Sequence, residues 1–249
     1  MQTKVKTIEE ITAIRSSGQM LSTVLDIVCL EAKPGITTKS LADIAAKELK
    51  SLGGEPAFLG YYGFPDVMCI SVNDEVVHGI PSDYVIKDGD IVSIDFGVTY
   101  KGMITDAARS VVVGTASKAK LALLSNTKAS LDAGIDQLHG GVRVGDISSA
   151  IQGVLDASGL GIVRDLVGHG VGHNLHEDPN IPNYGRAGSG QILQSGMTVA
   201  IEPMATMGSH RVYTAADGWT VLTRDGSLAA HFEDTILITD SGYEILTRI

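Results

Sequence analysis

Three histidines lie within twelve residues of the sequence, in GHGVGHNLHEDP at 168–179. His169 and His173 are spaced i, i+4, like the zinc ligands of an H-E-x-x-H helix, but Gly170 occupies the place where that motif needs a glutamate. The alternating glycines disfavour a helix, and no helix N-terminus follows that would bind a phosphate. In an extended segment His169 and His173 share one face and His176 takes the other. The segment therefore does not predict a three-histidine site, and a metal would need ligands from elsewhere in the chain.

A pair of carboxylates lies in two strand-like runs. The runs IVSIDFGV (91–98) and MITDAARSVVV (103–113) flank a turn around residues 100–102 and predict a hairpin. With the turn centred between residues 100 and 101, Asp95 lies directly opposite Asp106, and a shift of two residues leaves them diagonal neighbours on one face. Their Cβ atoms would lie roughly 5 to 8 Å apart. Like charges so placed destabilise a sheet, so the hairpin predicts either a bridging cation or one carboxyl that stays protonated.

An internal repeat extends this pair to four carboxylates. GITTKSLADIAAKELKSLG (35–53) aligns without gaps with GVRVGDISSAIQGVLDASG (141–159), and KDGDIVSID (87–95) aligns with QSGMTVAIE (194–202), which matches Asp95 with Glu202. MITDAA then aligns with AHFEDT and matches Asp106 with Glu233, once an insertion that contains the only tryptophan is allowed. Two such halves packed face to face would gather four carboxylates around one axis. That donor set suits hard or borderline divalent metal ions.

The elements that must position these residues follow from periodicity and capping signals. A capping box at Thr7-Ile8-Glu9-Glu10 begins a long amphipathic helix that Lys33-Pro34-Gly35 ends. Further helices are predicted over about Lys39–Leu52 after a Thr38 cap, about Lys118–Leu138, and Ile147–Ala157 behind Asp146, and the runs TVAIEP, WTVLT and FEDTILIT predict strands. With the repeat, these elements predict an α/β (α+β) fold of two similar halves, approximately 1–115 and 116–249, as one domain or two small ones.

The composition excludes several classes of function. The 249 residues are 44% hydrophobic and carry a formal net charge of −10, which argues against nucleic acid or an anionic membrane as a partner recognised through bulk charge. Two cysteines are too few for a disulfide framework, and the first residues lack the apolar run of a signal peptide. No apolar stretch is long enough to predict a membrane span. We therefore expect a cytoplasmic globular protein with no membrane anchor.

Six motifs together resemble the type I methionine aminopeptidases of the bacterial kind. VVHGIP, IVSIDFG, ITDAAR, GHGVGHNLHEDP, TVAIEP and HFEDT occur in the order and spacing of that family, and the resemblance extends from Met1 to Ile249. It implies a single catalytic domain, 1–249, with the pita-bread fold, in which two α/β halves related by a pseudo-twofold axis place antiparallel sheet, covered by helices, around a dinuclear metal site. The metal ligands implied by the motifs are Asp95, Asp106, His169, Glu202 and Glu233.

The resemblance also implies an activity. Two divalent metal ions, Co, Mn, Fe or Zn, would activate a water that attacks the scissile carbonyl of N-terminal Met peptides and nascent polypeptides with a small second residue. Glu202 would move the proton, His176 would contact the substrate carbonyl, and His78 would lie near the scissile amide. The methionine pocket would be lined by Tyr61, Phe64, Cys69 and Trp219. A monomer with transient ribosome contact is the partner state that we expect.

Some positions depart from the family pattern. Phe58 stands where a smaller residue is common, Leu175 where a Phe often sits, and Asp234 where His is frequent, so pocket volume and substrate ranking stay open. His173 is expected to be structural, and His231 has no assigned role. The alternatives are an Xaa-Pro aminopeptidase or prolidase, which usually carries an additional N-terminal domain, and a non-catalytic peptide-binding relative, which would have lost its ligands.

Overall fold

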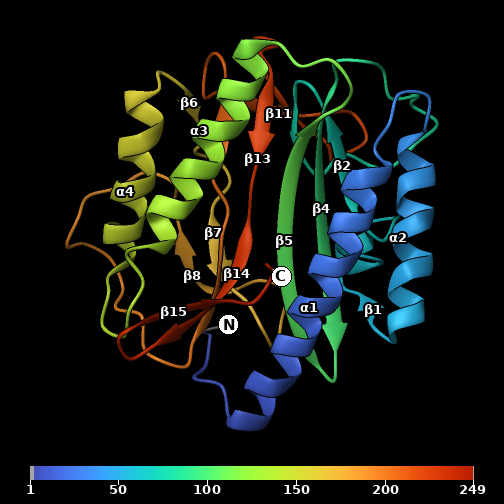
Figure 1. Cartoon of the computed structure of the whole chain (residues 1–249). Coiled ribbons are helices and arrows are strands. Elements are labelled where there is room, and N and C mark those ends of the chain that lie inside the picture. The colour runs from blue at the N-terminus through green and yellow to red at the C-terminus, as the bar shows by residue number, and fades with distance from the viewer. Residues whose placement is uncertain (1–2, 249) are drawn as a thin grey trace.

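The computed structural model describes residues 3–248, which form two halves side by side (Figure 1). In the first half α1 (Ile8–Glu31) and α2 (Thr38–Leu52) cover a four-stranded sheet. In the second half α3 (Lys118–Ile135) and α4 (Val144–Ala157) cover a five-stranded sheet. Among residues 3–248 no helix is long and apolar enough to cross a bilayer.

Both large sheets are antiparallel. The first has the order β1-β4-β2 with β5 paired to β4, and the second has the order β15-β14-β9-β7-β8. Two three-stranded sheets, β13-β10-β6 and β11-β12-β3, lie beside them. The strands and the one short 3-10 helix have the following bounds: β1 (Glu55–Pro56), η1 (Tyr61–Gly63), β2 (Cys69–Val72), β3 (Glu75–Val77), β4 (Ile91–Tyr100), β5 (Met103–Val112), β6 (Gly161–Ile162), β7 (Gly168–Gly170), β8 (Glu177–Ile181), β9 (Thr198–Ile201), β10 (Met204–Thr206), β11 (Val212–Thr214), β12 (Val221–Thr223), β13 (Ala229–His231), β14 (Asp234–Thr239) and β15 (Gly242–Ile245).

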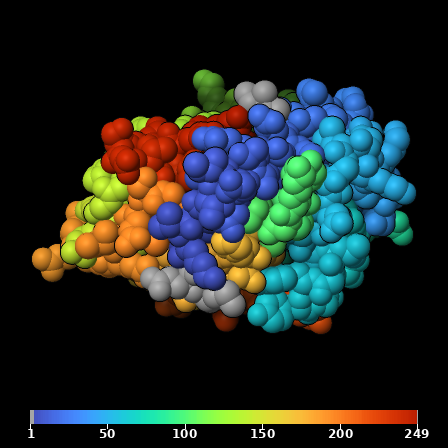
Figure 2. All heavy atoms as spheres, turned by 90° about the horizontal axis from the view of Figure 1, so that it is seen from below, coloured from blue at the N-terminus to red at the C-terminus, as the bar shows by residue number. Residues whose placement is uncertain are grey.

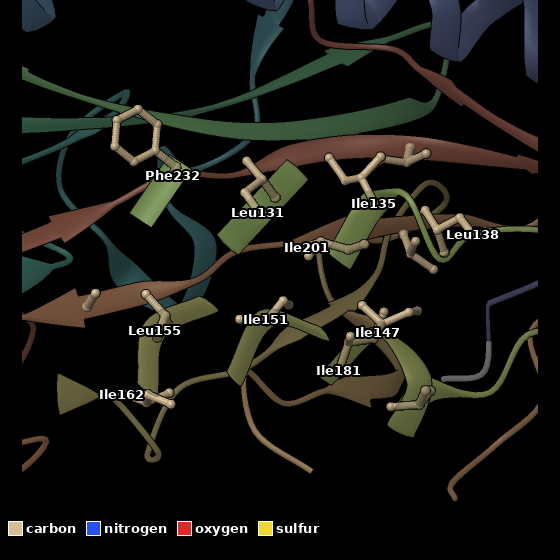
Figure 3. Close-up of a cluster of buried hydrophobic side chains, with 14 of the residues drawn as sticks. Leu131, Ile135, Leu138, Ile147, Ile151, Leu155, Ile162, Ile181, Ile201 and Phe232 are labelled. Atoms are coloured by element: carbon tan, nitrogen blue, oxygen red, sulfur yellow. The ribbon is translucent and has the colours of Figure 1, made fainter. Parts of the chain in front are cut away.

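Each half has its own hydrophobic core between helices and sheet. In the second half Ile147, Ile151 and Leu155 repeat at helical spacing along α4 and pack with Leu131 of α3 and Ile201 of β9, and all five are buried (Figure 3). A separate cluster fills the first half, where α1 and α2 pack against β4. Each core fixes the large sheet of its own half. The predicted site residues lie between the two halves.

The four helices predicted from the sequence are present, and some of their ends differ from the predicted residues. The capping box is present: Thr7 Oγ1 accepts from Glu10 N at 3.2 Å, and Glu10 Oε2 accepts from Thr7 N at 2.8 Å. The predicted Thr38 cap is wrong by one residue, because the side chain of Thr37 accepts the bond from Ser40 N. α4 begins at Val144 rather than Ile147, since Asp146 lies inside the first turn. α3 ends at Ile135, before the expected Leu138.

The hairpin of β4 and β5 is confirmed, but its predicted register is wrong by two residues. Tyr100 pairs with Met103 across a two-residue turn in which Lys101 and Gly102 both have positive φ, so Asp95 faces Ala108 and Asp106 faces Gly97. A two-residue hairpin turn of type I′ needs positive φ at both central residues, and Lys101-Gly102 meets this need more easily than Tyr100-Lys101 because glycine adopts such angles freely. Asp95 and Asp106 are therefore diagonal neighbours on one face, as the shifted register predicts.

The internal repeat is visible in the backbone. Gly35 and its match Gly141 both have φ +96°, and Gly89 and Gly196 have φ +87° and +83°. Such angles favour glycine, so each half keeps the same turns before its helix and its long strand. The carboxylate pairs differ, however. Asp234 pairs with Ile201, and one further step in that register brings Glu233 opposite Glu202, whereas the first pair is diagonal.

Candidate metal centre

The five predicted ligand residues come from both halves and meet between them. Asp95 lies on β4 and Asp106 on β5, whereas His169 lies on β7, Glu202 directly follows β9, and Glu233 lies between β13 and β14. All five are buried, with at most 9% of each residue exposed. The strand alternation that predicted Asp95 and Asp106 therefore holds in the structure, and the repeat brings its matched carboxylates to the same place.

The distances between ligand atoms fit a shared cation. One ligand atom each from Asp106, His169 and Glu233 lie within 4.8 Å of one another. His169 Nε2 is 3.3 Å from Glu202 Oε1 and 4.0 Å from Asp106 Oδ2. His169 Nδ1 lies 2.9 Å from the Gly170 carbonyl oxygen, which can accept a hydrogen bond only if Nδ1 carries the proton. That tautomer leaves the lone pair of Nε2 free to bind a metal.

Burial dominates the electrostatics of the four carboxylates. It raises the pKa of Asp95 from 3.8 to about 7 and raises the pKa of Glu202 well above its ordinary value. The pKa values of Asp106 and Glu233 are also raised well above normal, first by burial and then by the charges of the neighbouring carboxylates. Four ionised carboxylates in one buried site need positive charge nearby.

The hydrogen-bond inventory supports the same conclusion. Within residues 3–248, the buried atoms Asp95 Oδ1, Asp106 Oδ1 and Glu233 Oε1 have no hydrogen-bond partner. Buried carboxylate oxygens are rarely left without a hydrogen-bond partner, and a bound cation is among the usual reasons. Burial also lowers the pKa of His169 to about 3, so its imidazole is neutral. One neutral imidazole among carboxylates is a donor set that fits divalent metal ions.

The remaining predicted site residues line the same cavity as the ligands. His176 lies with its ring centroid 4.3 Å from that of His169, and its Nδ1 is 2.9 Å from the Tyr61 hydroxyl. Burial lowers the pKa of His78 to about 4, with the nearby His176 as a smaller cause, and burial also lowers the pKa of His176. Both rings are therefore neutral near pH 7 and able to donate one hydrogen bond each.

Apolar and aromatic side chains line the same cavity as the carboxylates. Phe64 and Trp219 meet edge to face with centroids 5.1 Å apart, and Cys69 pairs with Asp95 between β2 and β4. These side chains, the apolar wall of the cavity, are Phe58, Tyr61, Tyr62, Phe64, Cys69, Val77, Leu175 and Trp219. Tyr62 and Val77 were not predicted. Tyr62 lines the cavity although 86% of it is exposed, and its φ is 46°. An exposed residue outside a regular element follows no hydrophobic pattern, so no signal in the sequence predicts it.

His173 and His231 lie in different surroundings. His173 Nε2 lies 2.7 Å from Glu10 Oε1, away from the ligands, as expected for a structural residue. The expectation that His169 and His176 take opposite faces is wrong, because the chain reverses between β7 and β8 and both rings reach the site. His231 is 1% exposed, and its Nε2 lies 3.8 Å from Oε2 of both Glu202 and Glu233. Its i, i+2 spacing to Glu233 was the missed signal.

Asp234, a departure from the family pattern, is explained by its surroundings. Its side chain is fully buried and receives hydrogen bonds from Arg109 Nη2 at 2.6 Å, Arg248 Nε at 2.7 Å and Thr247 Oγ1 at 2.8 Å. Arg109 also donates to the backbone carbonyl of Glu233. This charged cluster fixes the backbone of Glu233 from the side away from the cavity.

Comparison with known proteins agrees with this geometry. Residues 12–240 match the model of metallopeptidase family M24. The methionine aminopeptidase of Clostridium perfringens is 48% identical, and methionine aminopeptidase 1 of Bacillus subtilis is 46% identical, each with 98% of both chains covered. A crystal structure of methionine aminopeptidase from Thermotoga maritima superposes with a TM-score of 0.98 at 44% identity and full coverage of both chains. The prolidase from Pyrococcus furiosus gives a TM-score of 0.80 at 25% identity, and the alignment covers 98% of this chain and 65% of that one.

Proposed function

The chain belongs to metallopeptidase family M24 and acts as a methionine aminopeptidase with the pita-bread fold, and from that premise we propose how its own residues carry out the reaction. The resemblance to methionine aminopeptidases found in the motifs is thereby confirmed, and the prolidase alternative is not favoured. One observation carries the proposal: four buried carboxylates and His169 line a cavity whose other lining residues are mostly apolar and aromatic. A single catalytic domain, with approximate halves 1–115 and 116–249, accounts for a site built from both sides.

Asp95, Asp106, His169, Glu202 and Glu233 are the proposed ligands of two divalent metal ions. Such ions, when bound, supply a water of lowered pKa and polarise the substrate carbonyl. The neutral Nε2 of His169 and the unpartnered carboxylate oxygens support this assignment. The donor set accommodates Co, Mn, Fe or Zn, so metal availability decides which is used.

Glu202 is the proposed general base and acid. One of its oxygens faces His169 and the other faces His231, so the carboxylate lies between the ligand cluster and the interior. From there it can take a proton from the attacking water and deliver it to the leaving amine. His176, held by the Tyr61 hydroxyl, donates to the carbonyl oxygen as negative charge develops, and His78 holds the scissile amide.

The apolar wall is the proposed pocket for the methionine side chain. Tyr61, Phe64, Cys69 and Trp219 offer aromatic and soft surface that suits an unbranched thioether. Phe58 and Leu175 also line the cavity, so they are proposed to set its depth rather than only to fill the core. Small second residues are the preferred neighbours of the cleaved methionine.

Nascent polypeptides are the proposed substrates of a monomer in the cytoplasm, with transient ribosome contact. The chain has a formal net charge of −10, yet one surface groove collects Arg164, Arg211, Arg224 and His210 with few acids. That concentration of positive charge supports a short-lived contact with a polyanion, strongly reduced by salt. The two cysteines are free, which agrees with a reducing compartment.

Peptide hydrolysis tests the proposal directly. The metal-loaded protein should release methionine from Met-Ala-Ser and much less from Met-Lys-Ser, and thorough chelation should abolish both reactions. A preference for proline at the second position, with any first residue, would instead support the prolidase alternative. Turnover that survives chelation would refute the metal-dependent mechanism.

A further inference from the structure

The segment between His169 and His176 lacks regular secondary structure, although it places two site residues. Residues 171–176 reverse the chain between β7 and β8, and few backbone hydrogen bonds hold them. Val171 N donates to Thr198 O at 3.1 Å, and Gly172 O accepts from Ile104 N at 2.7 Å. Gly172 N donates to Asn174 O at 3.1 Å, and the reversal beyond Asn174 depends on side-chain contacts to orient the His176 ring toward the cavity.

Glu177, the next residue after His176, supplies such a contact. Its Oε1 accepts from Asn174 N at 2.9 Å and so closes the turn that carries His176. The Glu177 side chain is 2% exposed. Burial alone would raise the pKa of Glu177, but hydrogen bonds from Asn174 and Thr3 and the charge of Lys6 hold that pKa below its usual value. A buried ionised carboxylate therefore fixes the exit of the reversal.

Lys6 provides the opposite charge from the other end of the sequence. Its Nζ lies 3.5 Å from Glu177 Oε2, and its side chain is 0% exposed. Nζ also donates to Thr3 Oγ1 at 3.0 Å and to Lys4 O at 3.1 Å. A Cβ added to Gly172 would come within 2.5 Å of Lys6 Cε, so the lysine stem passes directly against the reversal. The absence of a side chain at Gly172 makes room for it.

Backbone hydrogen bonds fasten this N-terminal arm, meaning residues 3–6, to the second half. Thr3 N donates to Asp178 O at 2.7 Å, and Lys6 N donates to Gly196 O at 2.8 Å. In Figure 2 the dark blue N-terminal residues lie against the golden residues of the second half and beside the green ones of the first. The arm thus lies across the boundary between the halves, underneath the reversal.

A buried ion pair is a poor source of net stability, because the cost of removing two charges from water offsets their attraction. What such a pair does provide is a defined geometry, since either partner alone would be an uncompensated buried charge. Lys6 and Glu177 join the N-terminal arm to the turn next to His176. The pair therefore restricts the position of the backbone that carries the His176 ring.

We propose that Lys6 and Glu177 are positioning residues, and that their buried pair holds the reversal so that His176 meets the substrate carbonyl. The proposal rests on the proposed function, in which His176 contacts that carbonyl. Removal of Lys6 leaves the Glu177 charge buried without its partner, so the turn at Asn174 rearranges and the His176 ring moves. A displacement of about 1 Å at a reacting group can cost about 100-fold in rate.

The test compares Lys6→Met, Glu177→Gln and the double variant in the metal-loaded full chain. Gln at 177 keeps an oxygen that can accept from Asn174 N, and Met at 6 keeps the apolar stem. Each single variant should lower kcat for Met-Ala-Ser about 10- to 100-fold with KM changed less than about threefold, and the double variant should recover most of that loss. Glu10→Gln is the matched control, because Glu10 pairs with His173 of the same segment outside the cavity, and it should keep the wild-type kcat.

Histidine nitrogen NMR makes the test independent of the assay. The His176 signals should move in each single variant and return in the double variant, while the metal dissociation constants stay within about threefold of wild type. Unchanged His176 signals and kcat in folded Lys6→Met would overturn the proposal, as would equal loss in the double variant. If Lys6→Met does not fold, Thr3→Val, which removes one contact of the pair, takes its place. A wild-type protein that releases no methionine would refute the proposed function. The NMR comparison would still show whether the Lys6–Glu177 pair positions the His176 ring.

Discussion

Removal of the metal ions should make the stability of this protein fall as the pH rises from about 7 to about 8. Burial raises the pKa of Asp95 to about 7 and raises the pKa of Asp106, Glu202 and Glu233 well above their ordinary values. A carboxyl with a raised pKa keeps its proton in the folded state after the unfolded chain has lost it. The stability it contributes is complete below its ordinary pKa and is lost as the pH rises through its folded pKa.

The magnitude follows from the same shifts. For Asp95, a pKa change from 3.8 to about 7 corresponds to about 4 kcal/mol, at about 1.4 kcal/mol per pKa unit, and most of this is lost between about pH 4 and about 7. The fall above pH 7 therefore comes mainly from Asp106, Glu202 and Glu233. Each proton that the folded state retains above pH 7 makes the free energy of unfolding fall by about 1.4 kcal/mol per pH unit. The buried histidines make stability rise with pH, because burial lowers the pKa of His169 and His231 from 6.5 to about 3. This rise ends above about pH 6.5, where the histidines are neutral in the folded and the unfolded state. The window above pH 7 therefore isolates the carboxylates.

Urea unfolding at several pH values, with and without metal, measures this slope. The metal-free protein should lose stability across the window, and the metal-loaded protein should lose less, because the bound cations replace the retained protons. Calorimetric titration in two buffers of different ionisation enthalpy should show that metal binding near pH 7 releases at least about one proton. A metal-free stability that is flat or rises from about pH 7 to about 8, or metal binding without proton release, would refute the reasoning.

Three other substitutions have defined outcomes. His231→Leu should weaken metal binding about 10- to 100-fold, because His231 Nε2 faces both Glu202 and Glu233. His231→Gln keeps an N–H donor and should retain the metal affinity. Equal loss of affinity in both variants, measured by calorimetry, would contradict this role of His231. Gly97→Ala would place a Cβ 2.6 Å from Phe58 Cε1, which should push the ring into the cavity and raise KM for Met-Ala-Ser, and an unchanged KM would show that the ring does not border the substrate. Arg248→Met should lower the free energy of unfolding by about 2 kcal/mol, because it removes one of two arginines from buried Asp234, and urea unfolding of Arg224→Met is the surface control.

The positions of the four carboxylates proposed as ligands could be predicted from the sequence because short-range rules determine them. Strand alternation fixes the face of Asp95 and Asp106 whatever the turn, and the shift of two residues that the structure shows preserves that face. The repeat carried the same rule to Glu202 and Glu233. The exact partners depended on the turn type, which the sequence left open, so the predicted register was wrong although both carboxylates lie on the predicted face.

The contacts that orient the histidines could not be predicted in the same way. Lys6 and Glu177 are 171 residues apart, and a lysine in a polar N-terminal stretch has no pattern that indicates burial. The reversal between β7 and β8 also has no periodicity, so the faces assigned to His169 and His176 followed an extended chain that is absent there. His231 is different, since an extended chain over residues 231–233 would have predicted His231 and Glu233 on the same face.

The boundary between the halves explains how repelling carboxylates stay assembled before metal binds. Neutral bonds cross this boundary beside the ligands: Ala108 and Glu233 exchange backbone hydrogen bonds, and Thr235 Oγ1 accepts from Asp106 N and donates to Asp106 O. The N-terminal arm and Arg248 add contacts from regions near both ends of the sequence. None of these bonds uses a ligand oxygen, so they hold the backbone without competing for the metal. The carboxylates can then take up or lose protons and cations while the strands that carry them stay in place, which is the preorganisation that a hydrolytic metal site requires.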